Sequence, residues 1–428
     1  MKPLIISLML LSATTAPAAE KTFEDNFSDS TLRVDYTFSG LQSKQTIALS
    51  QRKCTPGWYG RRVNMDRLPQ RGKGRIVMTD AATGDTLYMN PFSSLFLEWI
   101  DTDESKTNQL AMHESYQLPM PLRPVNVTVE IDNHRKEPIA SVTNYIDPKD
   151  ILIQRPKVNE TTPYRYIRKA GDSKEKIDVA ILAEGYTAAE MDSFYRHAET
   201  AVASILSHEP FREMADRFNF VAVASPSKDS GVSVPRFNDW RRTAFSSNYS
   251  TFYSDRYLTT THVPDVHDAL LGIPYEHLVI LANTDEYGGG GIYNSYTLTT
   301  ARNPKFWPVV THEFGHSFAG LADEYFYDNA DAMNDTYPLD VEPWEQNVTS
   351  LADFDSKWAD MLDKGTKIPT EVGDPYKLGV YEGAAYSTKG LYRPFDRCRM
   401  RDNEFPVFCP VCQRTIMRII KFHTEELK

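Results

Sequence analysis

The residues most able to do chemistry lie in one short segment, where two histidines stand four residues apart. His312 and His316 occupy positions i and i+4, which share one face of a helix, so both imidazoles can bind one Zn²⁺. Glu313 lies on the neighbouring flank, within reach of a water molecule activated by the metal. Apolar neighbours indicate a helix packed on a core, but packing alone does not explain this order of side chains. The segment therefore predicts a catalytic zinc site with Glu313 as general base.

A catalytic zinc site keeps three protein ligands and one open position, so a third ligand is needed. Gly320 is expected to end the helix with a positive φ and to turn the chain back toward the metal. Asp323 stands at the offset from Gly320 at which the HExxHxxGxxH motif has its third histidine. Asp323 is therefore the predicted third ligand. Glu324 is either the alternative ligand or the hydrogen-bond partner of a histidine N–H.

Four consecutive glycines, residues 288–291, come shortly before this helix. The run lacks the GxGxxG pattern and does not predict phosphate binding. Glycines let another backbone approach closely, and an edge strand can pair with an extended peptide. Gly290, Gly291, Ile292 and Tyr293 are therefore candidates for a strand along which a substrate binds. The alternative is a mobile hairpin tip.

Three of the four cysteines, Cys398, Cys409 and Cys412, cluster near the C-terminus, and Cys54 stands alone. Cys409 and Cys412 form a CxxC motif, which occurs in zinc knuckles and in redox pairs. Because a second CxxC motif is missing, an all-cysteine zinc site is not supported. A local disulfide from Cys398 to Cys409 or Cys412 is the favoured prediction, since oxidising compartments permit it.

The elements that must position these residues fall into two regions. Residues 20–152 contain short alternating runs separated by turns and predict a β-sandwich accessory domain. Residues 153–176 are polar and charged and predict a linker. Residues 177–428 alternate strand-like and helical segments, which indicates an α/β domain with a partly parallel sheet. Its first helix is predicted to begin at a capping box formed by Thr187 and Glu190.

Composition and the first residues bound the class of protein. With 41% hydrophobic and 25% charged residues, the chain is typical of a packed globular protein. Its formal net charge of −11 disfavours nucleic acid as a partner. Residues 1–19 read as a signal peptide with a short apolar run and a small-residue cleavage site. We therefore expect export to the periplasm, the cell surface or the medium, without membrane insertion.

The segment 312–325 resembles the signature of the IgA peptidase family of zinc metallopeptidases, within the metzincin-like zincins. Residues 183–187, 288–294 and 398–400 resemble other blocks of that family, and the similarity spans about residues 165–420. The β-rich front also resembles the family's N-terminal domain. The resemblance implies a zinc-dependent endopeptidase fold with a Met-turn beneath the metal, for which Met400 fits.

The sequence as a whole predicts a multidomain protein, an N-terminal β-sandwich followed by an α/β zincin catalytic domain. One catalytic Zn²⁺ and a protein or peptide substrate are expected, and the family name does not transfer a substrate. Tyr386 and Tyr392 could donate to an oxyanion, but packing is the expected role in a chain with 23 tyrosines. The alternative function is an exported glycan- or protein-binding module with a relic zinc site. The presence of Glu313 argues against that alternative.

Overall fold

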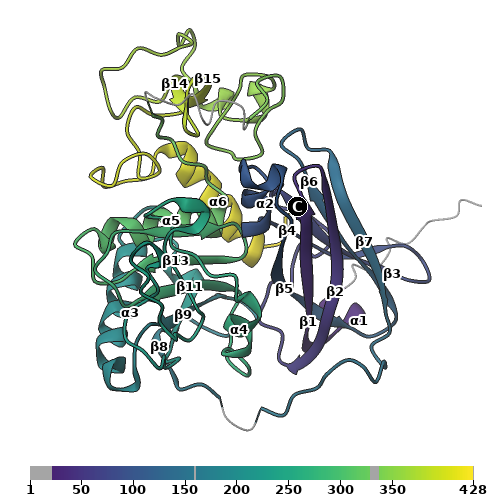
Figure 1. The fold of residues 1–428 in the computed structure, drawn as a ribbon. Helices are drawn as coiled ribbons and strands as arrows, with labels where there is room; N and C mark the ends of the chain where they lie inside the picture. Colours follow the sequence, from purple (N-terminus) through teal and green to yellow (C-terminus); the bar gives the residue numbers. More distant parts are fainter. Residues whose placement is uncertain (1–21, 159–160, 328–336, 428) are drawn as a thin grey trace, which may run out of the picture.

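The computed structural model describes residues 22–158, 161–327 and 337–427. The predicted signal peptide lies outside the described residues. Within the described ranges, no helix has both the length and the apolar character that crossing a membrane requires. The chain forms a β-rich front region, a mixed α/β region and a C-terminal extension with few regular elements (Figure 1).

The front region consists of two antiparallel sheets whose inward side chains share one core. The sheet orders are β2-β1-β5 and β4-β3-β6-β7. The strands are β1 (Phe27–Leu41), β2 (Lys44–Pro56), β3 (Gly74–Asp80), β4 (Thr86–Phe92), β5 (Leu110–Pro121), β6 (Val125–Asp132) and β7 (Pro138–Ile146). The short helices α1 (Phe23–Asn26) and α2 (Leu95–Trp99) complete this region. Burial alternates along β3 and β6, which agrees with the alternating pattern of their sequences.

The second region contains a six-stranded mixed sheet in the order β12-β13-β11-β9-β10-β8. Its strands are β8 (Tyr164–Arg168), β9 (Ile177–Glu184), β10 (Phe218–Val223), β11 (His277–Ala282), β12 (Gly289–Ile292) and β13 (Tyr296–Thr300). The four central strands run parallel, and the two edge strands β12 and β8 are antiparallel to their neighbours. β9, β10 and β11 are entirely buried, which explains why their sequences are continuous apolar runs.

One boundary of the sequence prediction is wrong. β8 lies inside the segment predicted to be a linker, and it pairs with β10. None of its five residues is fully buried, because the strand forms one edge of the sheet, and two of them are arginines, so it lacks the apolar run of a central strand.

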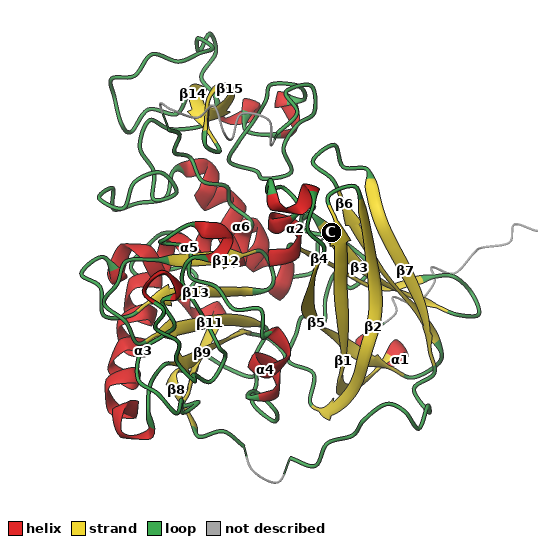
Figure 2. Ribbon diagram, in the orientation of Figure 1, coloured by secondary structure: helices red, strands yellow, loops and turns green. Residues whose placement is uncertain are grey.

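In the described part of the chain, four further α-helices and a small hairpin accompany these sheets (Figure 2). They are α3 (Met191–Ile205), α4 (Val263–Asp268), α5 (Phe306–Ala319), α6 (Pro410–Thr424), β14 (Tyr381–Ala384) and β15 (Ser387–Arg393). The predicted capping box is present: the backbone N–H of Thr187 donates to the Glu190 carboxylate at 2.8 Å. α3, α5 and α6 share a core with one face of the six-stranded sheet.

The opposite face of the six-stranded sheet shares its core with the front region. Leu182, Ile280 and Leu298 belong to the same buried cluster as the inward residues of the two antiparallel sheets. Polar contacts also join the two regions. Gln70 donates to the carbonyl of Ala319, the last residue of α5, at 2.8 Å. The front region therefore packs against both the sheet and the end of the helix that carries the histidine motif.

Candidate metal centre

Helix α5 presents His312 and His316 on the face opposite its packed side. Val310, Phe314 and Phe318 are buried in the core shared with α3, which fixes the rotation of the helix. The two imidazole rings meet edge to face with centroids 4.7 Å apart. As predicted, the helix ends at Gly320 in the left-handed region, at φ 58°, and the chain reverses there.

Three metal-binding atoms converge beyond this reversal. The Nε2 atoms of His312 and His316 are 3.1 Å apart. Oδ1 of Asp323 lies 3.1 Å from the first of them and 3.3 Å from the second. The Asp323 side chain is 7% exposed, and its Oδ1 has no hydrogen-bond partner within the described part of the chain. His312, His316 and Asp323 therefore form a group of side chains that could hold a metal ion.

The backbone fixes which nitrogen of each imidazole carries the proton. Nδ1 of His312 lies 2.9 Å from the carbonyl oxygen of Arg399, and Nδ1 of His316 lies 2.5 Å from that of Leu321. Because a carbonyl only accepts hydrogen bonds, each Nδ1–H donates and each neutral ring keeps a lone pair on Nε2. Both lone pairs belong to the atoms that converge with Asp323, and this tautomer is the one that a metal ligand requires.

The electrostatics of the group favour a cation between its members. Burial alone would lower the pKa of His316, but the charge of Asp323 outweighs this effect and raises the pKa to about 9. Burial alone would raise the pKa of Asp323, yet the two imidazoles hold it well below its usual range. The carboxylate therefore stays ionised and attracts positive charge at this point, whether the charge is a proton or a metal ion.

Glu313 lies next to this group, under the edge strand β12. Its carboxylate Oε1 is 3.1 Å from the position that a Cβ atom of Gly289 would take. A Cβ atom at Gly291 would overlap the carbonyl oxygen of Glu313. Burial raises the pKa of Glu313, and the two neighbouring histidines oppose that rise. The glycines let the strand lie directly against the histidine motif.

The strand predicted to bind substrate is the edge strand of the sheet beside the metal-binding group. Gly290 and Gly291 lie within β12, which pairs with β13 on one side. Its other side is partly covered, since Tyr257 bridges to Gly289. Ile292 and Tyr293 are 1% and 3% exposed, so their side chains serve packing. Substrate pairing along the β12 backbone stays a prediction.

Two residues that hold the Asp323 loop escaped the sequence reasoning. The Tyr386 hydroxyl donates a hydrogen bond to Oδ2 of Asp323. The Asn347 side chain bonds both the N–H and the carbonyl of Ala322, at 2.8 and 2.9 Å. Packing was the expected role of Tyr386, and no local pattern distinguishes Asn347. Both act by positioning a carboxylate more than 20 positions away along the chain.

Met400 is fully buried in a turn beneath helix α5. A Cβ atom at Gly315, between the two histidines, would lie 2.8 Å from the Met400 sulfur. The turn is closed by N–H groups of Arg401 and Asp402, which both donate to the carbonyl of Cys398 at 2.9 Å. The Met-turn role that the family resemblance implies for Met400 stays a prediction.

Glu324 does not join the histidines. Its carboxylate is directed instead to the three clustered cysteines, and its backbone N–H donates to the Met400 carbonyl at 2.9 Å. The predicted disulfide is absent: Cys398, Cys409, Cys412 and Cys54 are all free thiols. The three sulfur atoms share one pocket with a carboxylate, an arrangement that spacing along the sequence could not reveal.

Comparison with protein families defines the class of this chain as a peptidase. The family model described as IgA Peptidase M64 matches residues 166–377 and 371–420, and the model described as Peptidase M64 N-terminus matches residues 22–142. The chain therefore belongs to the IgA peptidase M64 family, which implies a metallopeptidase acting on proteins or peptides. No curated protein sequence matches it.

Proposed function

We propose that this protein is an exported zinc-dependent endopeptidase with a metzincin-like zincin catalytic domain. The observation that carries the proposal is the convergence of His312, His316 and Asp323 beside Glu313. Membership of the IgA peptidase M64 family supports the peptidase activity. The mixed sheet, the histidine helix α5 and Met400 beneath it support the zincin fold. The signal-like residues 1–19 support export.

The three atoms suit Zn²⁺ in both chemistry and spacing. Imidazole nitrogen and carboxylate oxygen are common zinc ligands, at about 2.0–2.2 Å from the ion. In a tetrahedral site, ligands at about 2.0 Å from the ion lie about 3.3 Å from one another. The three separations of 3.1, 3.1 and 3.3 Å are close to this value. Three protein ligands leave one position open, which is typical of a catalytic site.

The protein's own residues supply the remaining chemistry. Bound Zn²⁺ would polarise a carbonyl oxygen and make water acidic enough to attack near neutral pH. Glu313 takes a proton from the attacking water and delivers it to the nitrogen of the leaving amine. Its position beside the ligand group suits both steps, since the proton must be accepted and then released. Asp323, which Tyr386 orients, supplies the negative charge of the ligand group.

The alternative, an exported binding module with a relic zinc site, is not favoured. A relic site has no need of a base, and Glu313 lies beside the ligand group. The family match covers the region that contains the histidine motif as well as the β-rich front, so it supports a peptidase and not an isolated binding module.

The substitution Glu313→Gln tests the mechanism. The variant keeps the size of the side chain and leaves the three ligands in place, so we expect one full equivalent of zinc at this site. Peptide hydrolysis should fall about 10²–10⁴-fold, the usual contribution of a general base. Hydrolysis of a peptide library would be followed by mass spectrometry, and metal content by elemental analysis.

A matched control is Glu199→Gln, which changes an exposed glutamate on α3 that pairs with Arg165. This variant should keep both metal and activity, and a chelator should abolish its activity. Undiminished hydrolysis by Glu313→Gln protein would refute the role of Glu313. A native protein that binds no metal and cleaves no peptide would refute the peptidase proposal itself.

A further inference from the structure

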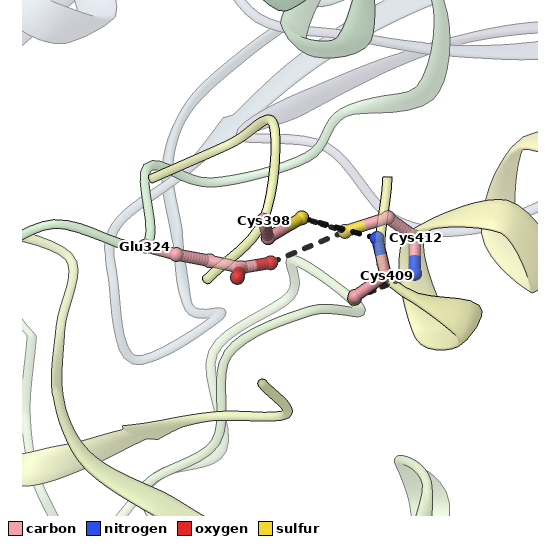
Figure 3. Close-up of side chains that lie close together, drawn as sticks. All are labelled: Glu324, Cys398, Cys409 and Cys412. Atoms are coloured by element: carbon pink, nitrogen blue, oxygen red, sulfur yellow. Dashed lines mark hydrogen bonds between the residues drawn. The ribbon is translucent and has the colours of Figure 1, made fainter. Parts of the chain in front are cut away.

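A second group of buried side chains able to bind metal lies directly behind the predicted catalytic centre. The side chains of Cys398, Cys409, Cys412 and Glu324 lie close together, and one ligand atom of each lies within 4.8 Å of the others (Figure 3). All four side chains are fully buried. None of them belongs to the histidine group.

Three separate segments contribute these residues. Glu324 follows the predicted zinc ligand Asp323 in the loop after α5. Cys398 belongs to the turn that holds Met400 beneath that helix. Cys409 is the N-cap residue of α6, and Cys412 lies in the first turn of the same helix. The CxxC motif thus supplies two sulfurs from one helix start, and the fold brings the third sulfur and the carboxylate to them.

Backbone N–H groups donate hydrogen bonds to two of the three sulfurs. The N–H of Cys409 donates to the sulfur of Cys398 at 3.2 Å, and the N–H of Cys412 donates to the sulfur of Cys409 at 3.4 Å. The start of a helix also favours negative charge. Hydrogen bonds to ligand atoms are typical of metal sites, where they orient the ligands.

The spacing fits a single tetrahedral ion. Sulfur ligands at about 2.3 Å from zinc lie about 3.8 Å apart in a tetrahedron. The sulfurs of Cys398 and Cys412 are 3.8 Å apart, and the sulfur of Cys412 is 3.2 Å from Oε1 of Glu324. An iron–sulfur cluster would need room for its own iron and sulfide atoms, which ligands within 4.8 Å of one another do not leave.

The carboxylate of Glu324 lacks the partners that its burial demands. Oε1 accepts from the Asn347 side chain at 2.9 Å, but Oε2 has no hydrogen-bond partner among the described residues. In the same described ranges, Glu324 makes no ion pair with an arginine, lysine or histidine. A buried carboxylate needs a compensating positive charge, and a metal ion among the sulfurs would supply it.

We propose that Cys398, Cys409, Cys412 and Glu324 bind a structural zinc ion. Four protein ligands close the coordination sphere, which is typical of a structural site and leaves no position for substrate. The three thiolates select a soft or borderline metal, and the carboxylate favours zinc over Cu(I). This site is independent of the proposed peptidase chemistry.

The ion would join the parts of the fold that shape the catalytic centre. Through Glu324 it holds the loop of Asp323, and through Cys398 it holds the turn of Met400. Through the CxxC motif it ties both to α6. The hydrogen bond from the Glu324 N–H to the Met400 carbonyl, 2.9 Å long, already joins two of these segments. The proposed role is to fix the third catalytic ligand in place.

Counting zinc in the full-length mature protein and its variants tests this proposal. The protein, purified without chelators, should contain two equivalents by elemental analysis. The double variant His312→Ala/His316→Ala should retain one, and X-ray absorption should show mainly sulfur neighbours at about 2.3 Å from that zinc. The double variant Cys409→Ser/Cys412→Ser should lose the sulfur-bound ion. The control Cys54→Ser, which changes the buried cysteine of β2, should keep two.

The histidine variant decides the matter even if the cysteine variant does not fold. No zinc in that variant, or zinc with only nitrogen and oxygen neighbours, would overturn the proposal. An intact mass lower by two hydrogen atoms under denaturing conditions, together with zinc absent from the histidine variant, would identify a disulfide instead. The structural-zinc proposal is judged by zinc content and zinc neighbours, and the catalytic proposal is judged by peptide hydrolysis. Failure of one proposal can therefore be distinguished from failure of the other.

Discussion

The buried carboxyl group of Glu114 should make the stability of this protein depend on pH. It lies on β5 and is 3% exposed. Burial raises its pKa to about 8, although a hydrogen bond with Ser94 opposes the shift and the nearby Glu98 adds to it. The substitution Glu114→Gln keeps the shape of the side chain and removes the ionisation. It should therefore change how stability depends on pH and leave the fold intact.

The sign of the effect follows from the two states of the carboxyl group. In the unfolded chain Glu114 has an ordinary pKa near 4.5, so it has lost its proton above that pH. The folded protein keeps the proton up to about pH 8. Between these limits the native protein loses about 1.4 kcal/mol of stability for each unit by which the pH rises. Across the whole interval this amounts to at most about 5 kcal/mol, a large part of a domain's stability.

Urea denaturation of both proteins, followed by tryptophan fluorescence from about pH 5 to about pH 8, measures this effect. We expect similar stability of the two proteins near pH 5 and a growing advantage for Glu114→Gln as the pH rises. Glu199→Gln, at the surface of α3, controls for the loss of one negative charge and should follow the native profile. Parallel profiles for the native protein and Glu114→Gln would refute the reasoning.

Two further predictions concern residues around the histidine group. Tyr386→Phe should weaken metal binding about 10–100-fold, because Asp323 loses the hydroxyl that orients it; a chelator competition measures this, with Tyr392→Phe as control. Gly291→Ala should destabilise the protein by about 1–3 kcal/mol in thermal unfolding, because the new methyl group overlaps the Glu313 carbonyl. Gly373→Ala, where a Cβ atom meets nothing within 4 Å, is its control. If a test variant and its control had equal effects, the role assigned to Tyr386 or to Gly291 would be contradicted.

The part of the site that the sequence could predict is the part encoded locally. The spacing of His312 and His316 predicts a shared helix face, and Gly320 predicts the end of that helix. Asp323 lies only three residues further, so its convergence with the histidines could be expected from the turn. The continuous apolar runs of β9, β10 and β11 likewise predict buried strands.

The part that could not be predicted depends on contacts between distant segments. Tyr386 reaches Asp323 from 63 positions away, and Cys412 reaches Glu324 from 88 positions away. In neither pair does the spacing along the sequence indicate that the two residues are in contact. The edge strand β8 was missed for another reason: an exposed edge strand does not need an apolar sequence, so it resembles a linker.

The shared core has a consequence for the modularity of this protein. Two family models divide the chain, yet Leu182, Ile280 and Leu298 of the α/β region are covered by the same apolar cluster as the front sheets. A chain that began after the front region would expose this face of its sheet to water and would lose the cap that Gln70 places on α5. The two regions therefore share one core, although separate family models describe them. We therefore expect that the α/β region, produced without the front region, would not be an autonomous enzyme.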